Sequence, residues 1–422
     1  MKLSKDLRTI YVFAILSSII LIFGWGVLNT PDSITYINAW DNYSMGKLDM
    51  LRTPIYPLFL GVIKVIFGER LFCIVAVCIQ HLIFLISISY FYKLAQFLSN
   101  SIDIAFWLTL FYAIIPPITT WNNYILTESF AISGTILLVY ATIKIFEEIK
   151  VAYIFFFTVQ LTILVLLRPA LIYMLPVFAV IWFYFLFKKK AAIGIGGLCG
   201  VFIATICLLT YMKAFEKEYG LFASSSVNTV NQTHISRQYG LLNPDVIDDS
   251  KLKEGIIESY EKYGREMEDY ELAGKEAGRV FRDFDLKMKN DAIYASYKSN
   301  PVLWVKKCFG RLYRSAKKSL FLTLAGGFAT VFDMIGFNLN TLYLFLIIYT
   351  LLLSYWTLFK RELPVVSFLL YMLGVSNIIV SIIGAQGEWE RLILPSMPLY
   401  LLMFGQICTM FKVKSPLSIE FK

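Results

Sequence analysis

A short stretch after the first apolar run combines acidic, basic and aromatic side chains. It covers residues 31–60 and contains Asp32, Tyr36, Asp41, Asp49, Arg52 and Tyr56. Polar groups beside a hydrocarbon layer are costly unless they have a use. A carboxylate can take the proton of a hydroxyl group, and an arginine can bind a phosphate through two parallel N–H bonds. The pattern predicts an acid–base group next to a bound anion.

The composition predicts the elements that hold these residues. Of 422 residues, 58% are hydrophobic and 16% charged, whereas soluble domains have about 45–50% apolar and about 25% charged residues. Uncharged runs recur at the length that crosses a hydrocarbon core, about 20 residues. We therefore predict an all-α polytopic membrane protein with about ten transmembrane helices, at residues 9–29, 71–92, 103–119, 128–146, 151–167, 170–187, 191–212, 340–359, 364–384 and 393–411.

Lysine and arginine fall in alternate short connections between these helices, which predicts that both termini are cytoplasmic. The first span is interpreted as an uncleaved signal anchor. The apolar stretches 54–68 and 319–337 are interpreted as interfacial or re-entrant helices. The first is short and contains Lys64, and counting the second would reverse the sides of Lys360 and Lys412. The same basic connections explain the net charge of +9, so we expect membrane lipids and no nucleic acid as partners.

Three parts are predicted. Residues 1–212 form an N-terminal transmembrane module with a first external loop at 30–70, and residues 301–422 form an interfacial helix and the last transmembrane helices. Between them, residues 213–300 contain 13 Lys and Arg against 16 Asp and Glu and are predicted to be an extracytoplasmic loop domain. Its stretch 250–298 predicts two or three amphipathic helices. The stretch 224–245 is rich in turn residues and is interpreted as a loop able to fold over a site.

On this topology the candidate site residues gather at the outer membrane face. The centres of the predicted spans have almost no charges, so the pattern favours a site at the surface over a path through the bilayer. The candidates are Asp32, Tyr36, Arg52 and Tyr56 in the first loop, Glu128 at the fourth span, Arg168 between the fifth and sixth, His234 and Arg237 in the polar segment, and Glu390 and Arg391 before the last span.

This set suits transfer of a sugar from a polyprenyl phosphate. The phosphate leaving group needs cations and no general acid, and arginine matches its oxygens. The incoming hydroxyl needs a carboxylate within hydrogen-bond reach. One carboxylate with one or two arginines is the minimum, and the outer face provides it.

Several motifs also resemble one family. Asp32-Ser33 with Tyr36, Arg52–Leu60, Thr127-Glu128, Leu167–Pro169 and Glu390–Pro398 occur in order over most of the chain. Together they resemble the glycosyltransferase-C superfamily, and among its members bacterial enzymes of the protein O-mannosyltransferase and aminoarabinose transferase type. The resemblance implies a polyprenyl-phosphate sugar donor, Asp32 as the base and Arg391 as a ligand of the donor phosphate. It also implies the bacterial cytoplasmic membrane, with the site on the extracytoplasmic side.

The family pattern is incomplete. The chain lacks the Asp-Glu pair and the His-Pro-Pro motif of the eukaryotic mannosyltransferases, so neither mannose nor a protein acceptor is implied. We expect an inverting hexosyl- or pentosyltransferase acting on a glycan, lipid or protein. No cofactor is assigned from the sequence, and a divalent metal stays open, with only a weak acidic group at Asp245, Asp248 and Asp249.

Other interpretations stay open. Asp32 can be the N-cap of a short helix, Glu128 a first-turn acid, and Arg52 and Arg168 anchors among lipid headgroups. Arg391 can pair with Glu388. The alternative functions are a surface-polysaccharide polymerase or ligase with diphosphate-linked donors, and a transporter or lipid flippase. The stripe Lys307, Arg311, Arg314 and Lys318 favours lipid headgroups as contacts.

Overall fold

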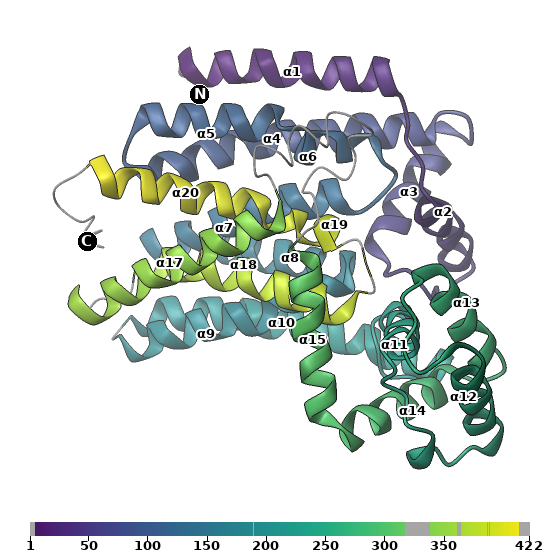
Figure 1. The fold of residues 1–422 in the computed structure, drawn as a ribbon. Coiled ribbons are helices and arrows are strands. Elements are labelled where there is room, and N and C mark those ends of the chain that lie inside the picture. Colours follow the sequence, from purple (N-terminus) through teal and green to yellow (C-terminus); the bar gives the residue numbers. More distant parts are fainter. Residues whose placement is uncertain are drawn as a thin grey trace.

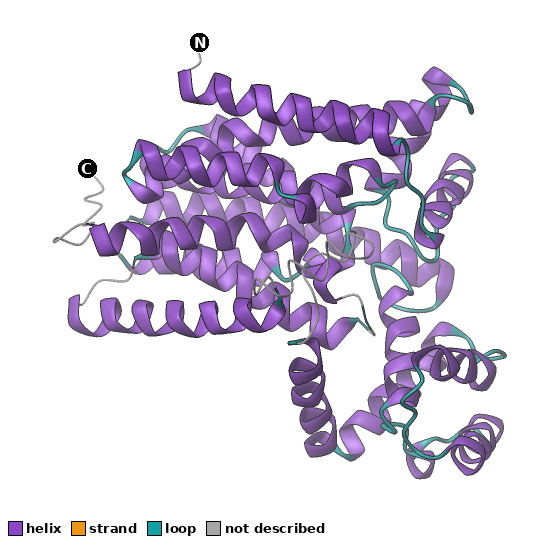
Figure 2. Cartoon of the chain, turned by 45° about the horizontal axis from the view of Figure 1, so that its top comes forward, coloured by secondary structure: helices purple, strands orange, loops and turns teal. Residues whose placement is uncertain are grey.

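The computed structural model describes residues 5–188, 190–316, 338–360, 364–385, 387 and 389–412. Within these ranges the chain forms helices and loops, and its extended pairing is limited to isolated bridges such as the one between Leu28 and Tyr124 (Figure 2). The predicted all-α polytopic fold is confirmed.

Long apolar helices form a bundle whose members run nearly parallel (Figure 1). Eight helices among the described residues are long and apolar enough to cross a membrane. They are α1 (Lys5–Trp25), α4 (Phe72–Ser99), α7 (Glu128–Glu147), η2 with α9 (Pro169–Leu171, Met174–Phe187), α10 (Ala191–Tyr219), α17 (Leu339–Lys360), α18 (Val365–Gly384) and α20 (Met397–Lys412), the last preceded by α19 (Trp389–Ile393) and η4 (Leu394–Ser396).

The other two predicted spans differ from straight long helices. The stretch 103–119 is broken into α5 (Ile102–Ile114), α6 (Pro116–Thr119) and η1 (Thr120–Asn123), with a bend of 54°. The break lies at Pro116 and Pro117, because proline cannot donate to the helix ladder and disfavours helix in the residue before it. Helix α8 (Val151–Leu167) matches its predicted bounds but has only 17 residues.

The two stretches interpreted as interfacial have different outcomes. Residues 54–68 form α3 (Ile55–Phe67), an apolar helix of 13 residues that is too short to span. It packs against α2 (Pro31–Ser44) and α4. Residues 319–337 lie outside the described residues, so that prediction stays untested.

A second unit lies at one end of the bundle, and we call it the polar domain. It consists of α11 (Val227–Gln238), η3 (Pro244–Val246), α12 (Ser250–Tyr263), α13 (Tyr270–Val280) and α14 (Leu286–Ser299). Figure 1 shows it beside α2 and α3, with the start of α1 and the end of α20 at the opposite end of the bundle. Helix α15 (Pro301–Ser315) runs across the bundle direction from this domain.

The polar domain has its own stabilising features. Asp249, Asp269 and Asp285 are N-caps whose side chains accept backbone N–H bonds at the starts of α12, α13 and α14, an arrangement that satisfies otherwise unpaired helix donors. A separate apolar core includes Leu242 and Ile256. Three amphipathic helices therefore occupy residues 250–299, as the sequence pattern predicted.

The stretch 224–245 is not the predicted loop. Residues Val227–Gln238 form α11, although Asn, Thr and Ser favour helices weakly. Tertiary bonds explain the difference: the Tyr297 hydroxyl donates to Gln232 Oε1 at 2.8 Å and shares a 2.8 Å hydrogen bond with Ser236. Helix α10 also continues to Tyr219, so it extends beyond the predicted end of this span at residue 212.

Candidate functional site

Asp32 occupies the first turn of α2. Thr30 is the N-cap and Pro31 the first helical residue, so the interpretation of Asp32 as the cap is wrong. The Thr30 N–H donates to Ser33 Oγ at 2.9 Å. The positive end of the helix dipole favours a charged carboxylate in this turn. Helical spacing also places Thr35 and Tyr36 on the same face as Asp32.

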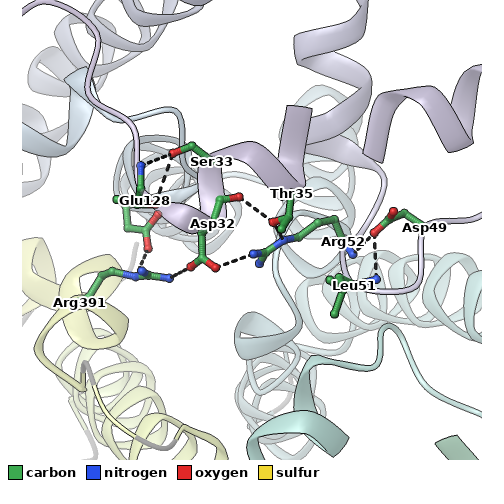
Figure 3. A network of polar contacts seen from close by, with 9 residues as sticks. Asp32, Ser33, Thr35, Asp49, Leu51, Arg52, Glu128 and Arg391 are labelled. Carbon is green, nitrogen blue, oxygen red and sulfur yellow. Dashed lines mark hydrogen bonds and ion pairs between the residues drawn. The ribbon is translucent and has the colours of Figure 1, made fainter. Parts of the chain in front are cut away.

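Two arginines from distant parts of the chain hold Asp32. Arg52 Nη2 lies 2.7 Å from Asp32 Oδ1, and Arg391 Nη2 lies 2.7 Å from Oδ2. Arg391 is 359 residues away along the chain. Figure 3 shows the carboxylate between the two guanidinium groups. The structure thus brings together three residues that the sequence could only assign to one end of the bundle.

A second carboxylate extends this group. Glu128 Oε1 lies 2.9 Å from Arg391 Nε and 3.3 Å from Arg168 Nη1. Three guanidinium groups and two carboxylates form the continuous chain Arg52, Asp32, Arg391, Glu128, Arg168, which we call the charge cluster. With all five groups ionised its net charge is +1, which favours an anionic ligand.

The two carboxylates differ in access to solvent. The Asp32 side chain is 35% exposed, whereas that of Glu128 is 1% exposed. Glu128 is therefore a buried partner that aligns arginines, and Asp32 is the carboxylate that a bound molecule can reach. The Arg52 and Arg391 side chains are 12% and 13% exposed.

Arg52 is fixed from several directions. Asp49 Oδ1 accepts the N–H groups of Leu51 and Arg52, and Arg52 Nε donates to Thr35 Oγ1 at 2.7 Å. The guanidinium lies 4.2 Å from the centre of the Tyr36 ring, a favourable cation–π contact. Among the described residues Arg52 Nη1 has no hydrogen-bond partner, so one donor is left for a ligand.

The residue after Arg52 links the first loop to the next candidate. The Thr53 hydroxyl donates to the Leu167 carbonyl at 2.9 Å. Pro54 takes the cap position of α3. Because Leu167 directly precedes Arg168, this bond joins the Arg52 segment to the end of α8.

Glu128 is placed by the broken fifth span. Gln80 on α4 donates to the carbonyls of Asn122 and Tyr124, and Ser129 donates to Asn122 Oδ1 at 2.5 Å. The buried Gln80 amide thus satisfies two backbone carbonyls at the end of the broken span. The chain can then start α7 at Glu128 with its side chain facing the arginines.

The surroundings of Asp32 change the pKa of its carboxyl group. Burial raises this pKa, but the charges of Arg52 and Arg391 and their hydrogen bonds outweigh burial and hold it below the usual value. Opposite charges within about 4–6 Å favour the ionised form. The lowered pKa keeps Asp32 ionised in the free protein.

Four other predicted residues with described side chains, Tyr36, Tyr56, His234 and Arg237, are not among the five members of the charge cluster. Tyr56 is fully buried, packs edge-on against Tyr36 at 5.2 Å and donates to Gln80, so it supports Tyr36 and does not face a ligand. His234 lies on α11 of the polar domain, next to Gly274. The Glu390 side chain lies outside the described residues.

Arg237 has a structural position, which corrects its assignment as a ligand contact. It is completely buried and donates to the Ser259 hydroxyl and to the carbonyls of Ser259, Gly264 and Arg265. These four bonds lie within the polar domain. A guanidinium whose donors are occupied by these groups is not available to a substrate.

Two contributors were missed in the sequence. Thr35 was not singled out, although it lies three residues after Asp32 and so shares its helix face. Asp49 was noted only for its charge, and the spacing of Asp49 and Leu51 is that of a side chain capping its own turn. The three acids Asp245, Asp248 and Asp249 form no metal site, since no group of three His, Cys, Asp or Glu ligands converges within the described ranges.

Comparisons with known proteins identify the fold. No family model and no curated protein matches the sequence. Among solved structures, the oligosaccharyltransferase AglB of Archaeoglobus fulgidus, in complex with an inhibitory peptide and a dolichol-phosphate, is similar over 96% of this chain and 50% of its own, with a TM-score of 0.54 and 12% identity. The same enzyme tethered to an acceptor peptide is similar over 96% and 50%, with a TM-score of 0.53 and 12% identity.

This likeness establishes the fold and not the activity, because the identity is low. The fold is similar to that of an archaeal oligosaccharyltransferase, which agrees with the resemblance to the glycosyltransferase-C superfamily seen in the sequence. The chain spans about half the length of the archaeal enzyme.

Proposed function

We propose that this protein is a membrane glycosyltransferase that moves a sugar from a polyprenyl-phosphate donor to an acceptor. The observation that carries the proposal is Asp32, partly exposed and held 2.7 Å from both Arg52 and Arg391. Residues of these types suit the reaction, and the likeness in fold to an oligosaccharyltransferase with bound dolichol-phosphate supports the same class of donor. The site is on the extracytoplasmic side if the basic connections are cytoplasmic.

In the proposed reaction Asp32 takes the proton of the acceptor hydroxyl. The hydroxyl oxygen forms a bond with the anomeric carbon of the sugar as the bond from that carbon to the phosphate oxygen breaks. The electron pair leaves with the phosphate, so the leaving lipid phosphate gains one negative charge. No general acid is needed for this leaving group.

The arginines have a specific role in this scheme. The donor phosphodiester has one negative charge and the leaving phosphate has two, so Arg52 and Arg391 stabilise the transition state more than the bound donor. Interactions that strengthen in this way lower the barrier. As the guanidinium groups engage phosphate they weaken their hold on Asp32, which raises the pKa of its carboxyl group toward a range useful for a base.

The lipid phosphate tests the proposal directly. The full chain in nanodiscs is mixed with decaprenyl phosphate, decaprenyl diphosphate or decaprenol and examined by native mass spectrometry. We expect retention of the monophosphate over the alcohol, and loss of that preference in Arg391→Ala. Equal retention of the alcohol would contradict the proposal.

The other outcomes separate the alternatives. Preferential retention of the diphosphate would favour a polymerase or ligase. Movement of the lipid across a liposome membrane without covalent change would favour a transporter. The acceptor, whether glycan, lipid or protein, and the choice between a hexose and a pentose are then determined by offering each to the protein with a labelled donor.

A further inference from the structure

Helix α11 of the polar domain contacts both segments that supply arginines to Asp32. Its N-cap, Ser226, meets the chain two residues before Arg52, and its middle meets the end of α18, seven residues before Arg391. One contact thus comes from the N-cap of a 12-residue helix and the other from its middle. This position suggests a role beyond the stability of the polar domain.

The contact on the Arg52 side is a backbone hydrogen bond. The N–H of Ser226, which precedes α11, donates to the Met50 carbonyl at 2.9 Å. Met50 lies between Asp49, which caps the turn, and Leu51, whose N–H is bound by that cap. The start of α11 is thus joined to the turn that fixes the Arg52 backbone.

The contact on the Arg391 side is made by side chains. Asn231 Nδ2 donates to the Gly384 carbonyl at 3.1 Å, and Gln232 Nε2 donates to the Ile383 carbonyl at 2.9 Å. These carbonyls belong to the last turn of α18, where helices leave carbonyl groups unsatisfied. The amides of α11 therefore cap α18 from outside.

A buried arginine from α15 completes this cap. Arg311, which is 2% exposed, donates to the carbonyls of Ile383 and Ala385. Its positive charge at the C-terminus of α18 also suits the helix dipole. The expected lipid-facing stripe is thus incorrect for Arg311, because its charge is used inside the protein.

The capped turn is joined directly to the helix that carries Arg391. The indole N–H of Trp389 donates to the Ala385 carbonyl at 3.2 Å. Trp389 begins α19, and Arg391 lies two residues later on the same short helix. Displacement of the end of α18 would therefore displace the guanidinium that holds Asp32.

We propose that α11 is a positioning element that fixes the spacing of Arg52 and Arg391 around Asp32, with Asn231 and Gln232 as its positioning residues. The inference rests on the function proposed above, because that function gives the spacing its purpose. Neither residue touches the charge cluster in the described contacts. Each acts through the backbone of α18.

Asn231→Asp tests this role with a small chemical change, because it replaces the donating amide by an acceptor that repels the Gly384 carbonyl. Asn228→Asp is the matched control, since Asn228 is exposed on the same helix. Hydrogen exchange of the full chain in nanodiscs is followed in peptides covering residues 384–392. We expect about tenfold faster exchange in these peptides in Asn231→Asp. In Asn228→Asp we expect no change in the exchange rate. Equal exchange in the two variants would overturn the proposal.

A double-mutant cycle separates positioning from simple stability. The unfolding midpoint is measured for Asn231→Asp, Asp32→Asn and the double variant. Changes at distant, independent sites are additive, so a smaller effect of Asn231→Asp in the Asp32→Asn background supports action through the charge cluster. Additive shifts would overturn the proposal. Neither measurement needs a substrate, so failure of the lipid-binding experiment would refute the proposed function and leave these results readable.

Discussion

The arginines of the charge cluster differ from the buried arginines of the polar domain and of α15 in the groups that they bind. Arg52, Arg168 and Arg391 hold carboxylates, whereas Arg237 and Arg311 hold backbone carbonyls. A carboxylate and a phosphate present similar oxygens to a guanidinium, so the first group can exchange one anion for another. Backbone carbonyls cannot leave, so the second group is structural. Burial alone does not distinguish a ligand-binding arginine from a supporting one.

The largest expected effect concerns Asp32, the partly exposed carboxylate of the charge cluster. Asp32→Asn removes the proton acceptor and one negative partner of Arg52 and Arg391 while keeping the side-chain shape. We expect turnover to fall by about 10²- to 10⁴-fold, the usual contribution of a general base. The measurement is release of polyprenyl phosphate by reconstituted protein.

Asp41→Asn is the control for this change. Asp41 is exposed on the same helix, outside the charge cluster, and its substitution should leave turnover within twofold. Full turnover in folded Asp32→Asn protein would show that Asp32 is not the base.

The second prediction concerns Arg237, one of the two arginines that bind backbone carbonyls. Arg237→Met removes the four hydrogen bonds from the guanidinium to the Ser259 hydroxyl and to the carbonyls of Ser259, Gly264 and Arg265. Hydrogen bonds to charged groups contribute about 1.5–3 kcal/mol, so we expect a loss of about 3 kcal/mol in the free energy of unfolding of the polar domain. Hydrogen exchange in α12 measures it. Turnover of the folded fraction should change less than tenfold, because Asn231 and Gln232 remain in place.

The exposed pair of Lys251 and Asp283 serves as the comparison for that loss. Their side chains are 70% and 59% exposed, and exposed ion pairs contribute little. Lys251→Gln should leave exchange in α12 unchanged. A similar loss in both variants would mean that burial of the guanidinium is not what makes Arg237 important.

The smallest expected effect is a shift in pH dependence. Burial raises the pKa of the Asp32 carboxyl group, but Arg52 and Arg391 outweigh burial and hold this pKa below its usual value. A lowered carboxyl pKa means that the ion pairs stabilise the protein above the unfolded-state pKa and lose this effect as the pH falls through the lowered value. Arg52→Gln removes one charge and raises that pKa.

The acidic limb of kcat/KM should therefore move to higher pH in Arg52→Gln by about one unit. This limb reports the pKa values of groups in the free enzyme. In the free unmodified protein both arginines contact Asp32. Arg70→Gln, at an exposed arginine outside the cluster, is the control and should leave the limb in place. An unshifted limb in Arg52→Gln would show that another group controls it.

Much of the fold follows from local sequence signals. Run lengths predicted the spans, and charge at the ends of apolar runs placed Asp32, Glu128, Arg168 and Arg391 in one layer. The failures have local causes as well. Two prolines broke the fifth span, and α11 formed from weak helix formers because its polar side chains are satisfied by α14 and α18.

The sequence by itself determined that apolar segments of spanning length leave their charged residues at helix ends, because burying a charge in hydrocarbon is costly. It did not decide which of these charges meet. Arg237 and Arg391 are both arginines beside candidate loops, yet one binds carbonyls in the polar domain and the other binds Asp32 across 359 residues. Only the tertiary structure made that choice, because pairing over such distances depends on how helices pack and not on local propensity.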